Sequence, residues 1–382
     1  MPQSNIRCIG VNDHAVDLFE GQYEVPNGMA YNSYVVTDEK IAVLDTAEVH
    51  FTAEWLMNLD RALEGRLPDY LIVQHMEPDH SASIAAFMAK YPATVIVASQ
   101  KAFAMMKQFY ADEFADRRIV AAEGMKLPLG ATTLSFITAP MVHWPEVIMT
   151  YDEASGTLFS ADAFGKFGAL DVEDEWLPEA RRYYIGIVGK YGAQVQAVLK
   201  KAAALDIRQI CPLHGPVLTE NLGWYLDKYQ AWSTYQPEEK GVTVACASIY
   251  GHTTHAAQLL ADDLRARGVN VALYDLARCD MAQAVADAFR YDRLVLAASS
   301  YNAGVFPFMK TFIDHLTERN FQNRTVALME NGTWAPSAAK TMLKLLENSK
   351  NLTMAETTVS IRSELDDQSR EKLAALAEEL SR

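Results

Sequence analysis

The feature that most constrains the fold of this sequence is a regular alternation of apolar runs and amphipathic segments after residue 241. Apolar runs that predict strands occur at residues 242–247, 269–274, 294–298, 325–329 and 356–361. Segments that predict helices follow them at residues 254–267, 281–289, 308–316, 335–346 and 366–380. Because strands that alternate with helices form parallel sheets covered on both faces, we predict an α/β domain with a doubly wound, parallel five-stranded sheet.

The chain before residue 241 has a different pattern, with many short strands and fewer helices. Strands are predicted at residues 41–44, 71–73, 94–97, 133–137, 147–150 and 157–159, and helices at 51–63, 81–90, 102–110 and 194–204. This pattern predicts a core of two sheets with helices outside, an αββα sandwich. The polar residues 236–241 include a proline and a glycine, which is typical of a linker. We therefore predict two domains, at residues 1–240 and 241–382.

Composition excludes several classes of protein. A chain of 382 residues is long enough for two domains, and its 50% hydrophobic and 22% charged residues are ordinary for a soluble globular protein. The net charge of −15 and the lack of a basic run argue against nucleic-acid binding. The four cysteines form no C-x-x-C pair, which argues against a disulfide framework. With no signal peptide and no apolar stretch long enough to span a bilayer, the chain is expected in the cytoplasm, away from membranes.

Four potential metal ligands lie close together where a predicted strand ends. The strand at residues 71–73 runs into the sequence Q-H-M-E-P-D-H, which supplies His75, Glu77, Asp79 and His80. The alternative is that this segment is a polar loop that contains these residue types by chance.

Three further candidates each follow a predicted strand, namely His143, Asp162 and His214. Because strand ends at one edge of a sheet converge, we expect all of these side chains to share a pocket. The combined set contains four imidazoles and three carboxylates. Imidazole alone suits zinc, copper or iron, and the added carboxylates shift the preference toward iron or manganese. The sequence therefore predicts a binuclear, redox-active metal site.

The pattern H-x-E-x-D-H, followed by a later His, Asp and His, resembles the flavodiiron proteins, a branch of the metallo-β-lactamase superfamily. Hydrolases of that superfamily carry H-x-H-x-D-H, whereas this chain has Glu77 at the third position. The resemblance implies two non-haem irons per chain. It assigns His75, Glu77 and His143 to one iron, Asp79, His80 and His214 to the other, and Asp162 to a bridge between them. It also implies an aromatic residue near the irons, for which Tyr191 is the candidate; a packed helix-start residue is the alternative.

Three loops after predicted strands of the second domain form the candidate flavin site. The candidate residues are Ser248, Tyr250, Gly251, His252, Thr253 and Thr254 in the first loop, Ser300, Tyr301, Asn302, Ala303 and Gly304 in the second, and Asn331, Gly332, Thr333 and Trp334 in the third. Hydroxyls and backbone N–H groups before a helix can hold a phosphate, although a plain helix cap explains the first loop equally well. Ligands of doubly wound sheets bind at strand carboxyl ends. The three loops resemble those of flavodoxin, which implies FMN, and no G-x-G-x-x-G motif suggests a dinucleotide.

The resemblance implies a flavodiiron oxidoreductase that reduces O2 to water, NO to N2O, or both, with electrons relayed by FMN. It also implies an external electron donor such as rubredoxin, a rubredoxin reductase system or a reduced deazaflavin. A head-to-tail homodimer, or a tetramer made of two dimers, is expected to bring the flavin of one chain to the irons of the other. Trp144 and Trp334 are candidates for interface or core aromatics.

Two other functions stay open at this point. The chain could be a metal-dependent hydrolase of the metallo-β-lactamase superfamily with an accessory flavodoxin-like domain, although Glu77 argues against a dizinc site. It could also be a flavodoxin-type electron carrier whose first domain is structural. Metal analysis separates the three, because iron, zinc and no metal are expected respectively.

Overall fold

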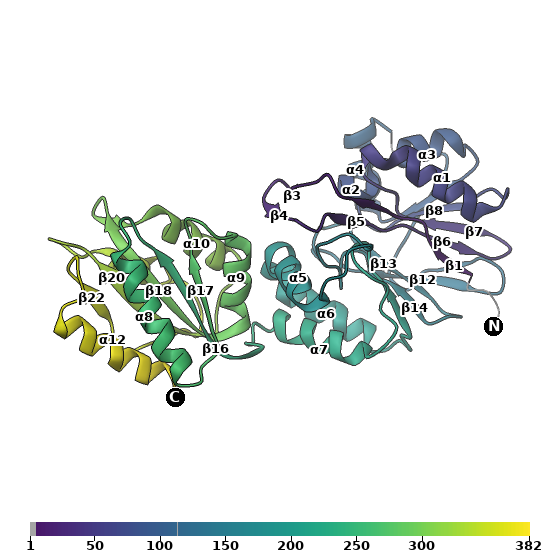
Figure 1. The fold of residues 1–382 in the computed structure, drawn as a ribbon. Helices are drawn as coiled ribbons and strands as arrows, with labels where there is room; N and C mark the ends of the chain where they lie inside the picture. Colours follow the sequence, from purple (N-terminus) through teal and green to yellow (C-terminus); the bar gives the residue numbers. More distant parts are fainter. Residues whose placement is uncertain (1–4, 113) are drawn as a thin grey trace. The chain divides into compact units, whose positions relative to one another are not determined.

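The computed structural model describes residues 5–112 and 114–382, which form two compact units (Figure 1). The first unit contains Met1–Tyr183 and Ala193–Gln230, and the second contains Tyr184–Gly192 and Ala231–Arg382. The units divide earlier in the chain than predicted, because residues after Gln230 pack with the second unit. The Arg324 guanidinium, for example, donates to the carbonyl oxygen of Tyr235 at 2.7 Å. Part of the predicted linker is strand, since β16 begins at Glu239.

The first sheet of the first unit has its parallel strands on one side and its antiparallel strands on the other. Its order is β1 (Ile6–Cys8), β6 (Tyr34–Thr37), β7 (Ile41–Leu44), β8 (Tyr70–Val73), β9 (Val95–Ala98) and β10 (Arg118–Val120). The neighbours from β7 to β10 pair in parallel, whereas β1 and β6 pair antiparallel. The carboxyl ends of β7 and β8 therefore lie at the same edge.

The second sheet also brings several strand ends to one edge. Its order is β11 (Lys126–Pro128), β12 (Thr133–Thr138), β13 (Ile148–Asp152), β14 (Thr157–Phe159) and β15 (Gln209–Cys211). Strand β13 is antiparallel to both β12 and β14, and β14 is parallel to β15. Strands β12, β14 and β15 therefore run in the same direction. Two short pairs complete the unit, β2 (Val11–Asp13) with β5 (Met29–Tyr31) and β3 (Leu18–Phe19) with β4 (Tyr23–Glu24).

The apolar faces of the two sheets pack together to form the core of the first unit. Tyr34 and Ile72 of the first sheet belong to the same buried cluster as Phe136 and Phe159 of the second. Because each sheet hides one face in this way, its other face is left for helices. Figure 1 shows α1 (Thr52–Leu63), α3 (Ile84–Lys90) and α4 (Gln100–Tyr110) beside the first sheet, and α5 (Trp176–Tyr183), α6 (Gly192–Ala202) and α7 (Leu222–Ser233) beside the second. The predicted αββα sandwich is confirmed.

The helices of this unit differ from the prediction at three places. The helix predicted at residues 81–90 is two helices, α2 (Pro78–Ser81) and α3, and neither α5 nor α7 was predicted. In all the residues that the structure describes, no helix is both long and apolar enough to cross a bilayer.

The second unit is the predicted doubly wound parallel sheet. Its order is β17 (Val271–Asp275), β16 (Glu239–Ala247), β18 (Tyr291–Tyr301) and β20 (Thr325–Asn331), followed by a fifth position shared by β21 (Thr353–Met354) and β22 (Val359–Ile361). These strands pair in parallel, and the short β19 (Gly304–Val305) pairs antiparallel with the end of β18. When the strands are numbered by their order in the chain, their order across the sheet is that of flavodoxin-like sheets.

Helices cover both faces of this sheet (Figure 1). Helices α8 (His252–Ala266) and α12 (Asp367–Leu380) share a buried cluster with β16, to which they contribute Leu260 and Leu376. Helices α9 (Met281–Arg290) and α10 (Pro307–Glu318) contact β16 and β18, and α11 (Ala338–Leu345) contacts β18 and β20. The loops after β16, β18 and β20 are left uncovered at the carboxyl edge of the sheet, where the predicted flavin residues lie.

Candidate functional site

The first sheet supplies four of the predicted metal ligands from a single strand end. Strand β8 ends at Val73, and His75 and Glu77 follow in an extended loop. Pro78 begins α2, and the residue before a proline is restricted to extended conformations, as observed for Glu77 at φ −61° and ψ 137°. The single turn of α2 then carries Asp79 and His80. All of these side chains except Glu77 belong to buried residues.

The second sheet supplies the other three. His143 lies in the connection from β12 to β13, Asp162 follows β14, and His214 follows β15. All three are buried. The His214 loop is tied to the first sheet, because the Asn32 side-chain amide donates to the carbonyl oxygens of Pro212 at 2.9 Å and Gly215 at 2.8 Å. The structure thus brings all seven predicted ligands together between the edges of two sheets.

The seven side chains separate into two groups around one shared carboxylate. In the first group, Glu77 Oε2 lies 3.2 Å from His75 Nε2 and 3.0 Å from His143 Nε2. In the second, Asp79 Oδ2 lies 3.4 Å from His80 Nε2 and 3.3 Å from His214 Nε2. The ligand atoms within each group lie within 4.8 Å of one another, a spacing that could hold a metal ion.

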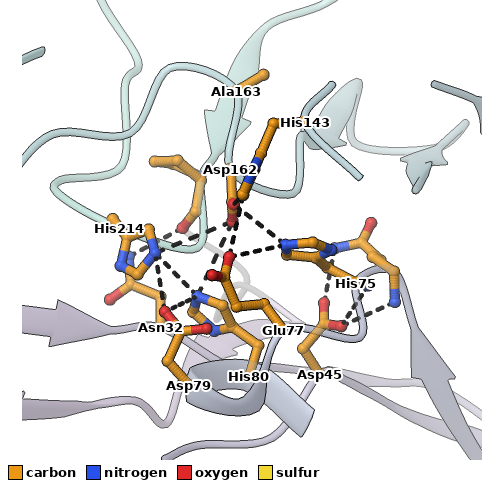
Figure 2. Close-up of polar contacts among 12 residues, drawn as sticks. Asn32, Asp45, His75, Glu77, Asp79, His80, His143, Asp162, Ala163 and His214 are labelled. Carbon is orange, nitrogen blue, oxygen red and sulfur yellow. Dashed lines mark hydrogen bonds and ion pairs between the residues drawn. The ribbon is translucent and has the colours of Figure 1, made fainter. Parts of the chain in front are cut away.

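Asp162 faces both groups (Figure 2). Its Oδ2 lies 3.0 Å from His143 Nε2 and 3.4 Å from His75 Nε2. Its Oδ1 lies 3.9 Å from the Nε2 atoms of both His80 and His214. Each oxygen of one carboxylate is therefore directed to a different pair of imidazoles, which is the geometry of a ligand that bridges two cations.

The buried carboxylates fit a metal centre because they lack other partners. Both oxygens of Asp79 and both oxygens of Asp162 are buried, and no residue that the structure describes donates a hydrogen bond to them. The short distances to the histidine nitrogens do not have hydrogen-bond geometry. A buried charge without a partner is costly, and buried acids in proteins are normally paired or bound to metal. Two cations among these oxygens and nitrogens would satisfy all of them.

The charges of the site shift its pKa values in the direction that favours a cation. Burial alone would raise the pKa of Asp162, but His75 and His143 hold it well below its usual range. Burial would lower the pKa of His143, but the nearby carboxylates of Asp162 and Glu77 raise it to about 9. His80 differs, because burial and the nearby His214 outweigh Asp79 and lower its pKa to about 4. The lowered pKa values of Asp162 and Glu77 keep these two carboxylates ionised, and they create the negative potential that a metal ion would neutralise.

Two carboxylates that support the site were not predicted from the sequence. Asp45, directly after β7, accepts hydrogen bonds from the backbone and side-chain amides of Gln74 at 2.8 and 2.9 Å and from the backbone of His75 at 3.3 Å. Burial raises the pKa of Asp45 to about 7 against the opposing effect of these bonds. Glu146 lies 2.8 Å from His75 Nδ1. Like several of the ligands, Asp45 directly follows an apolar strand, so the sequence contained a signal for it. Nothing in the sequence singled out Glu146.

Aromatic rings pack against candidate ligands on two sides of the site. The ring of Trp144 lies edge-on to that of His75, with 5.2 Å between centroids. Phe19 and Tyr183 lie 5.4 and 5.5 Å from His214. Within the first unit, Tyr183 contacts His214, and Tyr31 contacts both His80 and His214. The role of Tyr191 stays a prediction. Tyr191 is half-buried in a short helical turn of the second unit.

A cavity of about 480 Å³ opens among the strand-end loops of the second unit. The predicted residues that line it are Ser248, Tyr250, His252, Thr253, Ser300, Tyr301, Asn302, Ala303, Asn331, Gly332, Thr333 and Trp334. Gly251, Thr254 and Gly304 do not line it. Gly251 has a φ of +96° before α8, and its N–H donates to Ser248 Oγ at 3.1 Å, so it shapes the loop rather than the wall. This cavity lies at the edge of the sheet where ligands of such folds bind.

Sequence reasoning missed six residues of this cavity: Ile249, Ser299, Ala335, Pro336, Ser337 and Ser363. Five of them lie in or beside the three predicted loops. Ser363 lies beyond β22, in a fourth loop, and its backbone exchanges hydrogen bonds with the Asn331 side chain at 3.0 Å in each direction. A search for polar residues after the last strand, like the one made after the other strands, would have found Ser363.

Asp162→Ala is expected to abolish binding of both metals, because its two oxygens face both groups. The loss of metal affinity should be larger than roughly 10–100-fold, which is the loss caused by substituting residues that only support the ligands. Iron content after anaerobic reconstitution with Fe²⁺, measured against protein concentration, gives the result. Asp79→Ala is the matched control, since Asp79 contacts only the second group, and it should cost one metal ion. An Asp162→Ala protein that still holds two irons would contradict the bridging geometry.

Two protein-family models match different parts of the chain. Residues 29–215 match the ODP family beta lactamase model, and residues 244–372 match the flavodoxin model. The first match contains every candidate metal ligand. The second contains every residue that lines the cavity and none of the metal ligands. The two halves of the chain are thus of the two types that the sequence predicted.

Known proteins share this combination over most of the chain. The anaerobic nitric oxide reductase flavorubredoxin of Vibrio vulnificus is 26% identical over 87% of this chain and 69% of its own length. The fold matches that of the flavodiiron protein from Giardia intestinalis, with a TM-score of 0.90 and 23% identity over 98% of this chain and 95% of that one. It also matches rubredoxin oxygen:oxidoreductase from Desulfovibrio gigas, with a TM-score of 0.92 and 22% identity over 100% and 97%. The chain thus joins an ODP family beta-lactamase domain to a flavodoxin domain, and its fold is that of the solved flavodiiron proteins.

Proposed function

We propose that this protein is an oxidoreductase that reduces O2 to water, NO to N2O, or both, at a non-haem di-iron site that receives its electrons through FMN. The observation that carries this proposal is the Asp162 carboxylate, whose two oxygens face two separate pairs of histidines. The names of the relatives agree with it, since one is called a nitric oxide reductase and another an oxygen oxidoreductase.

The residues of the first unit fit iron. His75, Glu77 and His143 would hold one ion, Asp79, His80 and His214 the other, and Asp162 both. Mixed imidazole and carboxylate donors favour iron or manganese, and the carboxylate of Glu77 makes the site harder than an all-histidine zinc position. When bound, two irons supply the redox chemistry for O2 or NO, and the protein supplies ligands, position and shelter from water.

The exposure of the ligands indicates the side from which a small substrate enters. The side chain of Glu77 is 15% exposed and that of Asp79 is 10% exposed, whereas those of His75, His80 and Asp162 are 2% exposed or less. The aromatic rings of Trp144, Phe19 and Tyr183 close other sides of the site. We therefore place the approach of O2 or NO beside Glu77, where a carboxylate ligand meets solvent.

The cavity of the second unit fits FMN. Its volume of about 480 Å³ is in the range of small-molecule sites, about 300–1,000 Å³. The start of α8 offers backbone N–H groups to a phosphate, together with Ser248, His252 and Thr253. Tyr250 and Trp334, which are 89% and 91% exposed at the cavity, provide flat surfaces for the flavin ring. Gly251, Thr254 and Gly304 do not line the cavity, and their contacts with the flavin stay predictions.

We further propose that residues 1–240 carry the di-iron site and residues 241–382 the FMN site. The electron donor is proposed to be external, such as rubredoxin, a rubredoxin reductase system or a reduced deazaflavin; rubredoxin appears in the name of the Desulfovibrio gigas relative. The homodimer, the tetramer built from it and the cytoplasmic location stay predictions.

The purified protein is expected to contain two irons and one FMN per chain and to react rapidly with O2, NO or both after anaerobic reduction. Stopped-flow mixing with each gas, followed at the flavin absorption band, measures the reaction. Glu77→His is expected to raise zinc affinity and to lower the reduction rate by at least about 100-fold, because it removes a carboxylate ligand. A native protein that carries zinc, shows no redox change at its metals and hydrolyses esters would instead support the hydrolase.

Thr253→Asp is expected to weaken FMN binding at least tenfold, about 1.4 kcal/mol, because it places a negative charge against the phosphate. Thr253 is buried, and its hydroxyl lies 3.0 Å from Ser299 Oγ within the cavity wall. Fluorescence titration of the flavin-free protein with FMN measures the change. Gln258→Asp is the matched control, since it adds the same charge at an exposed position farther along α8 and should leave FMN affinity unchanged. A Thr253→Asp protein that binds FMN normally would contradict this phosphate position.

Electron transfer between the chains of the proposed homodimer can be tested by complementation. One chain carries Asp162→Ala and the other carries Thr253→Asp, and the two inactive proteins are mixed after reversible dissociation. Activity is expected to return in about half of the mixed dimers' sites, because an intact flavin of one chain then meets an intact metal site of the other. Full activity of the unmodified protein as a monomer at low concentration would contradict transfer between chains.

A further inference from the structure

The two halves of the candidate metal site differ in what lies behind their histidines. Behind His75 lies Glu146, in the connection from β12 to β13. The Glu146 side chain is fully buried, and its Oε1 lies 2.8 Å from His75 Nδ1. The same oxygen accepts a hydrogen bond from the backbone N–H of Met76 at 2.9 Å. The carboxylate thus holds both the ring of His75 and the backbone of the residue that follows it.

This contact fixes which nitrogen of His75 is free for a metal. Glu146 Oε1 accepts from Met76, and a carboxylate oxygen has no proton to donate to the ring, so His75 Nδ1 must be the donor. The proton at Nδ1 leaves the lone pair of Nε2 available, and Nε2 is the atom that faces Glu77 and Asp162. A carboxylate in this position orients the ring and makes the imidazole a stronger ligand.

The histidines of the other half have weaker support. The ring of His214 places its Nδ1 2.7 Å from the carbonyl oxygen of Ala30, which is a neutral acceptor. The Nδ1 of His80 is buried and has no hydrogen-bond partner among residues 5–112 and 114–382. Apart from the shared Asp162, the half around His75 therefore has two carboxylates, Glu77 and Glu146, whereas the half around His214 has only Asp79.

We propose that Glu146 is a positioning residue that makes the position formed by His75, Glu77 and His143 the tighter of the two metal positions, so that it fills first. This inference rests on the proposed di-iron site, and it adds an order of loading and a residue that sets it. Its physical basis is the extra negative charge behind His75, because acceptors at Nδ1 fix the tautomers of both His75 and His214 but only the acceptor of His75 is charged.

The test is an anaerobic titration of the metal-free full-length protein with Co²⁺, followed by visible absorption. The unmodified protein is expected to bind two Co²⁺ in two resolved steps. Glu146→Gln keeps the size of the side chain and an oxygen that can accept from His75 and Met76, but it removes the charge. It should weaken the first step about 10–100-fold and leave the second unchanged. In the iron-loaded protein the same variant should raise the reduction potential of the centre, because a nearby negative charge has been lost.

Asp152→Asn is the matched control. Asp152 is also a fully buried carboxylate with one unpartnered oxygen, but it lies at the far end of β13 and bonds to Thr132 and the backbone of Ala154. Its titration should equal that of the unmodified protein. If Glu146→Gln does not fold, Glu146→Asp serves instead, because the shorter side chain withdraws the carboxylate from His75 and should weaken the same step.

The outcomes separate this inference from the proposed function. An unmodified protein that binds fewer than two Co²⁺ would overturn the binuclear site itself. Two-step binding that is identical in the unmodified protein and Glu146→Gln would overturn only the role of Glu146. Equal weakening of both steps would also overturn it, because the effect would then not be confined to one position.

Discussion

The candidate metal site depends on the approach of one carboxylate, that of Asp162, to four imidazoles that come from both sheets. Its oxygens lie 3.0–3.9 Å from the four Nε2 atoms. Such a group can form only if the edge of the first sheet, which carries His75 and His80, is held against the edge of the second, which carries His143 and His214. Two features hold these edges together: the apolar core between the sheets, and the hydrogen bonds from the Asn32 side chain to the His214 loop.

Burying these charges has a cost that the surrounding structure manages residue by residue. An ionised carboxylate taken out of water loses several kcal/mol of hydration unless a partner replaces it. Asp45 is stabilised by three N–H donors, and Glu146 by two, and both thereby fix the loop that carries His75. Asp79 and Asp162 have no such donors. This difference separates supporting acids from acids that are arranged to receive a cation.

The sequence allowed prediction of whatever follows a local rule. A potential ligand directly after an apolar strand was enough to find His75, Asp162 and His214, because parallel strands bring their ends together. Helix α5 was missed because Pro178 interrupts its helical pattern, although a helix tolerates proline in its first turn. Helix α7 was missed because its apolar residues are spread around the helix and form no single apolar face. Glu146 could not be predicted, because its role comes from a contact with His75, 71 residues away. The division of seven ligands into two groups likewise needed three dimensions, or the family resemblance.

The central claim is that one carboxylate holds two irons in two different ligand sets. Anomalous diffraction from crystals of the native protein, recorded at the iron and zinc absorption edges, tests it most directly. Two iron peaks per chain are expected, one on each side of Asp162, with His75, Glu77 and His143 around one and Asp79, His80 and His214 around the other. A single peak, or peaks that appear only at the zinc edge, would contradict it.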